Sequence, residues 1–288
     1  MNQEIFNKAE TLTEALPWIS RYEGKTFVVK YGGAAMTEPE LRESFARDVA
    51  LLSKVGVRVV IVHGGGKEIT GIAAKLGLET RFVDGQRYTD EAMVDVVQMV
   101  LAGRTNKDIV RRVNKYDGDA AGLCGIDGGV LQAEKFAEGG VDLGLVGRVT
   151  EVRTQYLELL LDGGFMPVIA PLGVDAAGTV YNINADVAAA QIAGALKAEK
   201  LVFLSDVEGV LENGKLVRRM TEKAAEALIT SGVIGGGMIP KVRSAFDALE
   251  AGVGTVHMID GRAKHSLLLE IFTDKGVGTA LFTAQEGK

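Results

Sequence analysis

The stretch Thr26-Phe27-Val28-Val29-Lys30-Tyr31-Gly32-Gly33 decides the fold. Its first five residues form the short β-rich run of a buried strand, and the two glycines that follow allow a tight turn. A helical segment comes next, from about residue 38 to 54, with Leu41, Phe45 and Val49 on one face. A strand, a glycine turn and an amphipathic helix in this order predict parallel strands joined by crossover helices.

The same alternation runs through most of the chain. Further strands are predicted at 57–62, 166–170, 200–205, 255–259 and 279–282. Further helices are predicted at 69–76, 90–112, 186–196, 221–229 and 240–249. Paired glycines between residues 123 and 152 predict hairpins. We therefore expect an α/β fold, a three-layer αβα sandwich around a central, mostly parallel sheet.

The length of 288 residues allows one large or two modest domains. We divide the chain into an N-terminal helix (1–23), a first lobe (24–195) and a second lobe (196–288). No disordered linker stands out near residue 196, which favours two lobes that share one sheet.

Composition excludes several classes of protein. The net charge of −6 disfavours nonspecific attraction to nucleic acid or to an anionic membrane. No apolar run is long enough to span a membrane, and the N-terminus lacks the pattern of a signal peptide. The single cysteine, Cys124, cannot form an internal disulfide, and with 3 histidines it gives no cluster with metal-ligand spacing. We expect a cytoplasmic protein without a dedicated metal site.

Glycine is the outlier, with 37 copies against 5 prolines. Three glycine clusters lie where a strand ends or a helix begins: Lys30 to Gly33, His63 to Lys67, and Gly235 to Lys241. Such turns expose unpaired N–H groups at the positive end of a helix and let a phosphate approach closely. Any one cluster could be only a tight turn. Three clusters, with lysines at their edges, favour phosphate binding.

Familiar nucleotide and esterase signatures fail in detail. Gly24-Lys25-Thr26 resembles the end of a P-loop, but Ile19 stands where the earlier glycine is required. No stretch fits the dinucleotide pattern G-x-G-x-x-G. The run from His63 to Gly66 resembles a lipase oxyanion loop, yet no serine has the required G-x-S-x-G setting. We interpret His63 as a support for its loop and not as an acid or base.

Six short segments, in order along nearly the whole chain, resemble the amino-acid kinase family and, within it, the N-acetyl-L-glutamate kinases. They are Lys30-Tyr31-Gly32-Gly33, Val62-His63-Gly64-Gly65-Gly66, Gly85-Gln86-Arg87-Tyr88-Thr89, Asn182-Ile183-Asn184-Ala185-Asp186, Ser205-Asp206-Val207-Glu208-Gly209-Val210 and Gly237-Met238-Ile239-Pro240-Lys241. Each segment is weak by itself, whereas the ordered set is specific.

The resemblance implies transfer of the ATP γ-phosphoryl group to the side-chain carboxylate of N-acetyl-L-glutamate, a step of arginine biosynthesis. The first lobe would bind acetylglutamate and the second ATP. Mg²⁺ would arrive with ATP and be held mainly by phosphates. Since a carboxylate is already ionised near neutral pH, the reaction needs positioning and positive charge more than a general base.

The resemblance also assigns roles to individual residues. The catalytic set would be Lys30, Lys241 and Asp186, with Asp186 holding both ammonium groups. The substrate-binding set would be Gly65, Gly66, Arg87 and Asn182, with Arg87 and Asn182 on the α-carboxylate of acetylglutamate. Gly32, Gly33 and Gly64 would shape the phosphate path. Asp206 and Gly209 would belong to the nucleotide site.

Each of these residues also has an ordinary structural interpretation. Lys30 and Lys241 could be solvated surface charges. Asp186 could be a first-turn helix acid and Asn182 a turn residue. Arg87 could form a surface salt bridge of little worth. The order of the motifs favours the catalytic interpretation.

The ends of the chain resemble the arginine-inhibited subgroup. Ile5, Ala9, Leu12 and Leu16 share one face of a predicted N-terminal helix, with Phe6 and Trp18 nearby. In the subgroup such a helix links dimers into a hexamer, a trimer of dimers, whereas by itself it could dock on its own subunit. The resemblance places Lys223, His257, Glu270 and Gly276 around arginine as an inhibitor. A PII-type regulator is a further possible partner.

Two alternatives stay open. The first is another small-carboxylate kinase of the same family, which the pairing of Arg87 with Asn182 disfavours. The second is a non-catalytic arginine sensor on this fold. A sensor is expected to have lost at least one of Lys30, Asp186 and Lys241, and all three are present.

Overall fold

The computed structural model describes residues 3–83, 85–137 and 141–283, with side chains from residue 10 onward. Its centre is a sheet of eight described strands in the order β14-β16-β15-β11-β1-β2-β8-β5. From one edge to the other, these strands are Arg219–Thr221, Thr279–Phe282, Thr255–Asp260, Lys200–Ser205, Thr26–Tyr31, Arg58–His63, Met166–Ala170 and Ala120–Cys124. Because β11 pairs with β1, the strand order is continuous across residue 196. Neighbouring strands are parallel except β15 and β16.

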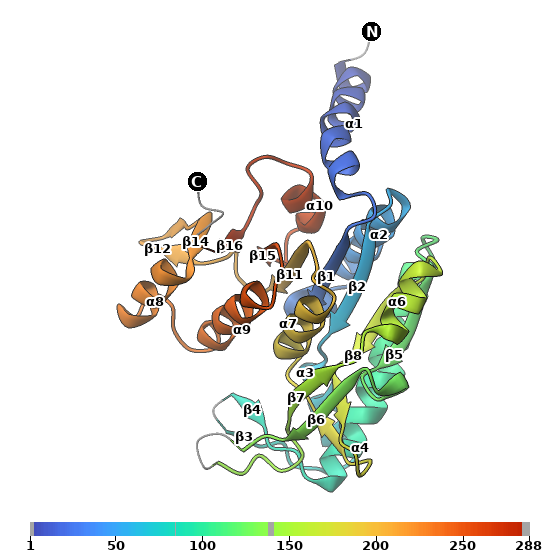
Figure 1. Ribbon diagram of the computed structural model, residues 1–288, viewed down its shortest axis with the longest axis vertical. Coiled ribbons are helices and arrows are strands. Elements are labelled where there is room, and N and C mark those ends of the chain that lie inside the picture. Colours follow the sequence, from blue (N-terminus) through green and yellow to red (C-terminus); the bar gives the residue numbers. More distant parts are fainter. Residues whose placement is uncertain (1–2, 84, 138–140, 284–288) are drawn as a thin grey trace.

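Helices cover both faces of this sheet (Figure 1). The core on one face joins the sheet to α6 (Gln155–Asp162), α7 (Ala185–Ala195), α8 (Glu222–Thr230) and α9 (Met238–Glu250). The core on the other face joins it to α2 (Pro39–Lys54), α5 (Asn106–Asn114) and α10 (Ser266–Ile271). The expected three-layer αβα sandwich is confirmed.

Strand β1 shows how the sequence produces the two cores. Successive side chains of a strand point to opposite faces, and the three central residues of the run, Phe27, Val28 and Val29, are apolar. Val28 packs into the core on the α7 side, whereas Phe27 and Val29 pack into the core on the α2 side. All three side chains are fully buried, as expected for a strand covered on both faces. The strand ends with Lys30 and Tyr31, next to the glycine turn.

A second, smaller sheet lies beside the first lobe's strands. Its order is β10 (Val180–Asn182), β9 (Leu172–Val174), β6 (Leu131–Lys135) and β7 (Gly147–Val152). Strands β6 and β7 are antiparallel, which confirms a hairpin within the glycine-rich segment. The prediction of hairpins is wrong for its start, because Leu123 and Cys124 belong to β5, a parallel edge strand of the central sheet. Parallel neighbours can be far apart in sequence, so local turn signals do not reveal this pairing.

The predicted helix over 90–112 is continuous but irregular. It consists of α4 (Glu91–Gln98), a π-helical segment η2 (Met99–Thr105) and α5. With α3 (Gly66–Lys75), α4 and η2 form a third core against β8 and β9. Two hairpins of two-residue strands, β3–β4 (Phe82–Val83, Gln86–Arg87) and β12–β13 (Leu211–Glu212, Lys215–Leu216), complete the strands. Short 3₁₀ turns, η1 (Gly33–Met36) and η3 (Asp127–Gly129), complete the helices.

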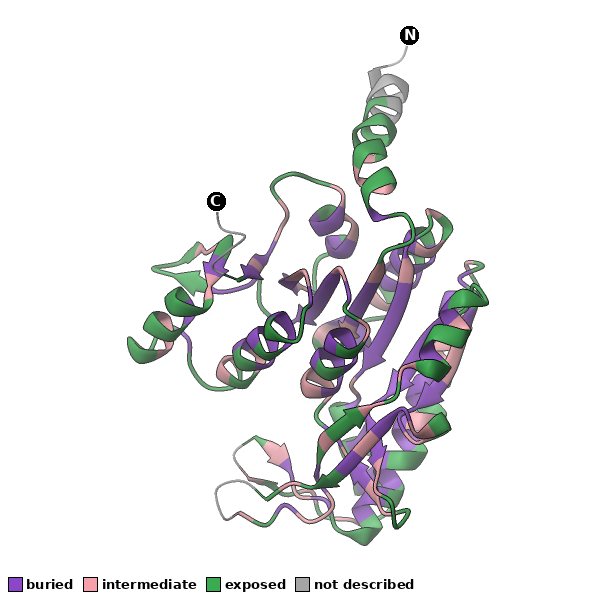
Figure 2. Ribbon diagram, in the orientation of Figure 1, coloured by how far each residue is buried: buried purple, intermediate pink, exposed green. Residues whose placement is uncertain are grey.

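Helix α1 (Gln3–Tyr22) projects from the body of the molecule (Figure 1). Its described part is largely exposed (Figure 2), and Leu12 and Leu16 are 75% and 57% exposed. Ile5 and Ala9 of the predicted apolar face, and the nearby Phe6, lie outside the described side chains. Within the described residues, no helix combines the length and apolarity needed to cross a membrane.

Candidate active site

Three charged side chains meet at the central sheet. Lys30 Nζ lies 2.9 Å from Asp186 Oδ1, and Lys241 Nζ lies 2.6 Å from Asp186 Oδ2. The three residues come from the end of β1, the first turn of α7 and the first turn of α9. The structure thus brings together the whole predicted catalytic set, whose members are up to 211 residues apart in sequence (241 − 30).

Local sequence explains why Asp186 faces this point. Asn184 is the N-cap of α7, and its Oδ1 accepts hydrogen bonds from the backbone N–H groups of Asp186 and Val187. Asp186 therefore sits in the first helical turn, where the helix dipole favours a negative charge. Asp186 is thus a first-turn helix acid, as its ordinary structural interpretation predicted, and it also forms ion pairs with the two lysines.

The charge state of the cluster follows from its surroundings. Burial alone would raise the pKa of the Asp186 carboxyl, but the charges of Lys30 and Lys241 outweigh burial and hold that pKa at about 2. Burial lowers the pKa of Lys241, and the charge of Lys30 acts in the same direction. Two ammonium groups around one carboxylate leave an excess positive charge, which favours an anion here.

The first glycine turn is shaped by side chains that lie over it. A Cβ on Gly32 would be 2.5 Å from Lys30 Nζ, because the lysine folds back across this residue. Gly33 has a φ of +64°, and a Cβ there would collide with the Asp206 carboxylate. Asp206 itself accepts a 2.5 Å hydrogen bond from the Ala34 N–H. Asp206, at the end of β11, therefore fixes the turn that follows β1.

The second glycine turn borders a small cavity of about 190 Å³. Its lining includes the predicted phosphate and substrate residues Gly64, Gly65, Gly66, Arg87 and Asn182. All five are thus brought together at the carboxyl ends of β2 and β10 and on the β3–β4 hairpin. Open α/β sheets bind ligands at the carboxyl ends of their strands.

Arg87 is buried and holds its surroundings in place. Its Nη2 donates to the Gly66 carbonyl and to Thr70 Oγ1, each at 2.9 Å, and its guanidinium lies 4.8 Å from the centroid of the Phe82 ring. Burial lowers the pKa of this guanidinium. Asn182 Nδ2 donates to Thr89 Oγ1 at 3.2 Å. Arg87 therefore braces the glycine turn directly, a contact that the sequence did not predict.

A larger cavity of about 810 Å³ opens beside the charged cluster. Asp186, Asn184 and Val187 line one side, and Gly236 and Gly237 of the third glycine turn line another. This volume is within the usual range for small-molecule sites.

Gly209, the remaining nucleotide candidate, has a φ of +142° and packs so closely on Thr279 that a Cβ would lie 2.5 Å from Thr279 Oγ1.

A second charged cluster lies at β11, β15 and α10. His257 Nδ1 donates to Glu270 Oε1 at 2.6 Å, and Glu270 Oε2 accepts from the N–H groups of Val277 and Gly278 at 2.5 and 2.9 Å. Lys200 Nζ lies 3.0 Å from His257 Nε2, and burial lowers the pKa of Lys200 to about 8. A cavity of about 600 Å³ adjoins this cluster.

The residues that line this cavity show which of the candidate arginine-site residues lie close together. His257, Glu270 and Gly276 line it together, whereas Lys223 lies exposed on α8 and is not part of that lining. The sequence did not predict Lys200 or Trp18, which line it too. Lysine in an apolar strand was the available signal for Lys200, because a charge on a strand covered on both faces needs a buried partner.

A further cavity, of about 430 Å³, lies between α2, α3 and α5. Its arginines are largely paired within the chain. Asp108 accepts hydrogen bonds from Arg111 and Arg112, each at 2.8 Å, and Arg42 lies 3.6 Å from the same carboxylate. These pairs neutralise much of the positive charge around the cavity. Within the described part of the chain, no three His, Cys, Asp or Glu side chains gather as a metal site.

Comparison with known proteins identifies the family of the chain. Residues 25–260 match the model of the amino acid kinase family. An acetylglutamate kinase of Chlorobaculum tepidum is 55% identical over 283 residues, which cover 96% of this chain and 99% of that protein. An acetylglutamate kinase of Aquifex aeolicus is 53% identical over 293 residues, covering 96% and 98%.

Solved structures share the fold. An N-acetylglutamate synthase from Neisseria gonorrhoeae, complexed with coenzyme A and N-acetyl-glutamate, superposes with a TM-score of 0.86 at 29% identity. The match covers 95% of this chain and 63% of the synthase. A Giardia lamblia carbamate kinase bound to AMP-PNP superposes with a TM-score of 0.67 at 18% identity, covering 90% and 99%. By its family match and its close relatives, the chain belongs to the amino acid kinase family.

Proposed function

We propose that this protein transfers the γ-phosphoryl group of ATP to the side-chain carboxylate of N-acetyl-L-glutamate, giving N-acetyl-L-glutamyl 5-phosphate and ADP. The observation that carries the proposal is the Lys30–Asp186–Lys241 cluster, which lies between three glycine turns. The acetylglutamate kinases that are 53–55% identical to the chain supply the acceptor. The step belongs to arginine biosynthesis.

The cluster suits a reaction between two anions. The acceptor carboxylate is ionised near neutral pH and attacks without a general base. The barrier is the approach of negative charge to a phosphoryl group that is itself negative. Lys30 and Lys241 face that group from the two lobes, and Asp186 keeps their ammonium groups from moving apart. Their charge stabilises the transition state more than the separated reactants.

The substrate would lie with its side-chain carboxylate toward the cluster. Arg87 and Asn182 would hold the α-carboxylate at the mouth of the 190 Å³ cavity. The N–H groups of Gly33, Gly65 and Gly66 would line the phosphoryl path. ATP would occupy the side of residues 196–288, near Asp206 and Gly209, so that residues 24–195 form the acetylglutamate lobe.

Mg²⁺ would be held mainly by the phosphates of ATP. The two carboxylates nearest the path are already engaged, Asp186 by two lysines and Asp206 by the Ala34 N–H. The ion supplies positive charge that offsets the charge of the phosphates when it is bound.

Trapping the acyl phosphate with hydroxylamine tests the acceptor. The protein is supplied with MgATP and, in parallel, with N-acetyl-L-glutamate, free glutamate, aspartate or carbamate. Hydroxamate should form with N-acetyl-L-glutamate and at far lower rates with the other acids. Equal rates with free glutamate would favour another carboxylate kinase of the family, and no product with any acid would favour a non-catalytic sensor.

Regulation by arginine is the finer part of the proposal. Glu270 is the right partner for a guanidinium or α-amino group, and His257 and Gly276 line the same cavity. Lys223 completes the proposed contacts only if α8 moves toward the cavity. A related N-acetylglutamate synthase from Neisseria gonorrhoeae has been solved in complex with coenzyme A and L-arginine, at a TM-score of 0.81 and 28% identity. Arginine should lower the hydroxamate rate, and an unchanged rate at saturating arginine would refute inhibition.

Assembly is proposed from helix α1. Its exposed Leu12 and Leu16 need a partner, and we infer that α1 helices link dimers into a hexamer. Trp18 and Tyr22, at its base, line the cavity beside Glu270. Deleting the first 20 residues should give dimers with weakened arginine inhibition, measured by light scattering and by the hydroxamate assay. A hexamer that survives the deletion would refute this role. A cytoplasmic location and a PII-type regulator belong to the same proposal.

A further inference from the structure

A fully buried amide lies behind the second glycine turn. Asn106 is 0% exposed, and its Nδ2 donates to the Val168 carbonyl at 2.8 Å and to the Leu123 carbonyl at 3.2 Å. Its Oδ1 accepts from Lys107 Nζ at 3.0 Å. Carbonyl oxygens can only accept and an ammonium group can only donate, so these three partners fix which end of the amide carries the N–H groups.

The fixed amide determines the protonation of His63. Asn106 Nδ2 lies 3.2 Å from His63 Nε2. Burial lowers the pKa of His63 to about 4, so the imidazole is neutral near pH 7 and carries a single N–H. The two N–H groups of Asn106 Nδ2 are shared among three acceptors, the Val168 and Leu123 carbonyls and His63 Nε2, so one N–H is bifurcated. With this donor facing it, His63 Nε2 accepts and the proton is on Nδ1. That Nδ1 donates to the Gly64 carbonyl oxygen at 2.8 Å.

The bond to Gly64 determines the direction of the next N–H. The Gly64 N–H donates to the Tyr31 carbonyl at 2.9 Å, so both ends of this residue are held. A trans peptide is planar, and its N–H points away from its C=O. Holding the Gly64 carbonyl therefore aims the Gly65 N–H. Gly65 is the N-cap of α3, where backbone N–H groups have no acceptor within the helix.

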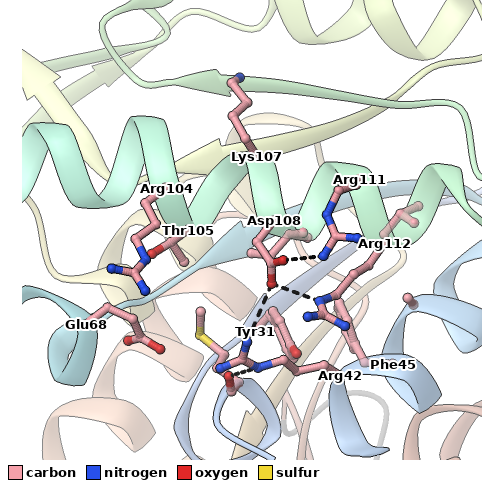
Figure 3. A pocket seen from close by; sticks show the side chains of 14 residues that line it. Tyr31, Arg42, Phe45, Glu68, Arg104, Thr105, Lys107, Asp108, Arg111 and Arg112 are labelled. Atoms are coloured by element: carbon pink, nitrogen blue, oxygen red, sulfur yellow. Dashed lines mark hydrogen bonds and ion pairs between the residues drawn. The ribbon is translucent and has the colours of Figure 1, made fainter. Parts of the chain in front are cut away.

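The π-helical segment explains how Asn106 reaches this position. One extra residue in a helical turn rotates every following side chain by about 100°. Leu101 and Thr105 of this segment press against the glycine turn, since a Cβ on Gly65 would be 2.5 Å from Leu101 Cδ2. Figure 3 shows Lys107 pointing away from Arg104 and Asp108, toward the opposite side of the helix. That side also bears Asn106, next to the sheet.

We propose that Asn106 and His63 are positioning residues that aim the Gly65 N–H at the transferring phosphoryl group. Neither side chain touches the substrate. Asn106 sets the tautomer of His63, and His63 sets the Gly64–Gly65 peptide. The inference rests on the proposed function, because it takes the second glycine turn as part of the phosphoryl path.

Nitrogen NMR of the intact protein tests the tautomer without any assay of activity. With ¹⁵N-labelled histidine the chain gives three imidazoles, and the His63→Asn variant identifies the signals of His63. We expect the proton on Nδ1, and no titration between about pH 8 and pH 5. A proton on Nε2, or a titration near the ordinary histidine pKa, would overturn the proposal.

Two substitutions of His63 separate the hydrogen bond from packing. His63→Asn keeps an amide N–H near the place of Nδ1, whereas His63→Leu fills the space without a donor. We expect His63→Leu to lower kcat by about 100-fold, and His63→Asn by less than about 5-fold. The KM for N-acetyl-L-glutamate should change by less than about twofold in both, because the affected donor acts on the phosphoryl group.

Ile61→Val is the matched control for destabilisation. Ile61 is fully buried in the same strand, two residues before His63 on the same face, and its side chain makes no hydrogen bond. It should lower the melting temperature and leave kcat within about twofold. Equal kcat values for His63→Leu and His63→Asn, in folded proteins, would overturn the proposal.

The Asn106→Asp variant tests the first step of the proposal, in which Asn106 sets the tautomer of His63. A carboxylate accepts hydrogen bonds where Asn106 donates, so His63 should gain a proton on Nε2, which is visible in the same NMR spectrum. An unchanged His63 tautomer in this variant would overturn the role of Asn106. If the variant does not fold, the wild-type tautomer and the two His63 variants still decide the proposal. If the protein makes no acyl phosphate at all, the proposed function fails while the tautomer result still stands.

Discussion

Two clusters in this protein each place a carboxylate against nitrogen-bearing side chains, and they differ in what else holds the carboxylate. Asp186 binds two lysine side chains, and its own side chain is 20% exposed. Glu270 is 5% exposed and binds His257 together with two backbone N–H groups of residues 277 and 278. The first arrangement leaves lysine donors free for an anion, whereas the second also fixes a loop.

The difference between the two clusters follows from the groups that bind each carboxylate. Each lysine ammonium can donate three hydrogen bonds. Lys241 donates one to Asp186 Oδ2 and Lys30 forms an ion pair with Oδ1, so both ammonium groups can also serve an anion. The Glu270 carboxylate, in contrast, ties a helix to the loop that follows it. A group that must stabilise developing charge needs hydrogen-bond donors that are still free. A group that shapes a site needs its hydrogen-bonding positions to be occupied.

The largest expected effect is on the first cluster. Asp186→Asn removes the charge that holds two ammonium groups within one site, so Lys30 and Lys241 should repel each other and move. We expect kcat in the hydroxamate assay to fall about 1,000-fold. Asp162→Asn, at an exposed surface pair with Arg58, is the control and should leave kcat unchanged. A loss below about threefold for Asp186→Asn would mean that the cluster is not catalytic.

Lys241→Ala removes one of the two cations and should have the next largest effect. We expect kcat to fall between about 100-fold and 1,000-fold, with the affinity for ATP changed by less than about threefold. The reason is that the lysine acts mainly on the charge of the transition state. Lys264→Ala, an exposed lysine, serves as the control. Unchanged turnover would remove Lys241 from the catalytic set.

Glu270→Gln should show the opposite pattern. It removes the charge that we propose binds arginine, and it leaves the first cluster intact. The concentration of arginine that halves the rate should rise by about 10-fold to 100-fold, with kcat in the absence of arginine within about twofold. Glu226→Gln, on the exposed face of α8, is the control. A large fall in kcat together with normal inhibition would contradict the division of roles.

The smallest effect concerns a third carboxylate, Asp48, which binds His265. Burial raises the pKa of Asp48 to about 6, although the hydrogen bond from His265 Nδ1, at 2.6 Å, opposes this rise. Because the unfolded value is about 3.9, ionising this group in the folded protein costs about 3 kcal/mol above pH 6. The free energy of unfolding is therefore highest, as far as Asp48 contributes to it, below about pH 4. This contribution is lost as the pH rises through about 6.

Asp48→Asn should therefore be more stable than the wild type at about pH 8, by about 1–3 kcal/mol. The advantage should disappear at about pH 3, where Asp48 is largely protonated in both the folded and the unfolded state. Urea unfolding at the two pH values measures the difference. A difference in the free energy of unfolding that is independent of pH would contradict the shifted pKa of Asp48.

The sequence predicted which segments form strands and helices better than it predicted which strands lie side by side. Strand β1 was predicted at residues 26–30 and observed at Thr26–Tyr31, because its apolar run and its glycine turn are local signals. The edge position of β5 was not predicted, since parallel pairing joins residues that are far apart in the chain. The π-helical segment was also missed, because the apolar periodicity of residues 90–112 predicts a helix but not its type.

The same division applies to the candidate sites. Residue types and motif order were enough to select Lys30, Asp186 and Lys241, and the structure brings all three into contact. They did not reveal that Arg87 binds the Gly66 carbonyl, or that Lys200 lies buried beside His257. Lys223 matched its motif position and yet lies outside the cavity that His257 and Glu270 line.

The sequence by itself determined the fold class, the glycine turns and the residues able to carry positive charge, because all of these depend on local periodicity and side-chain chemistry. Only the tertiary structure decided which groups meet. The distance between Lys30 and Asp186, the tautomer of His63 and the saturation of Glu270 depend on the order of strands in one sheet. That order is set by burial of apolar surface over the whole chain, which no local stretch of sequence encodes.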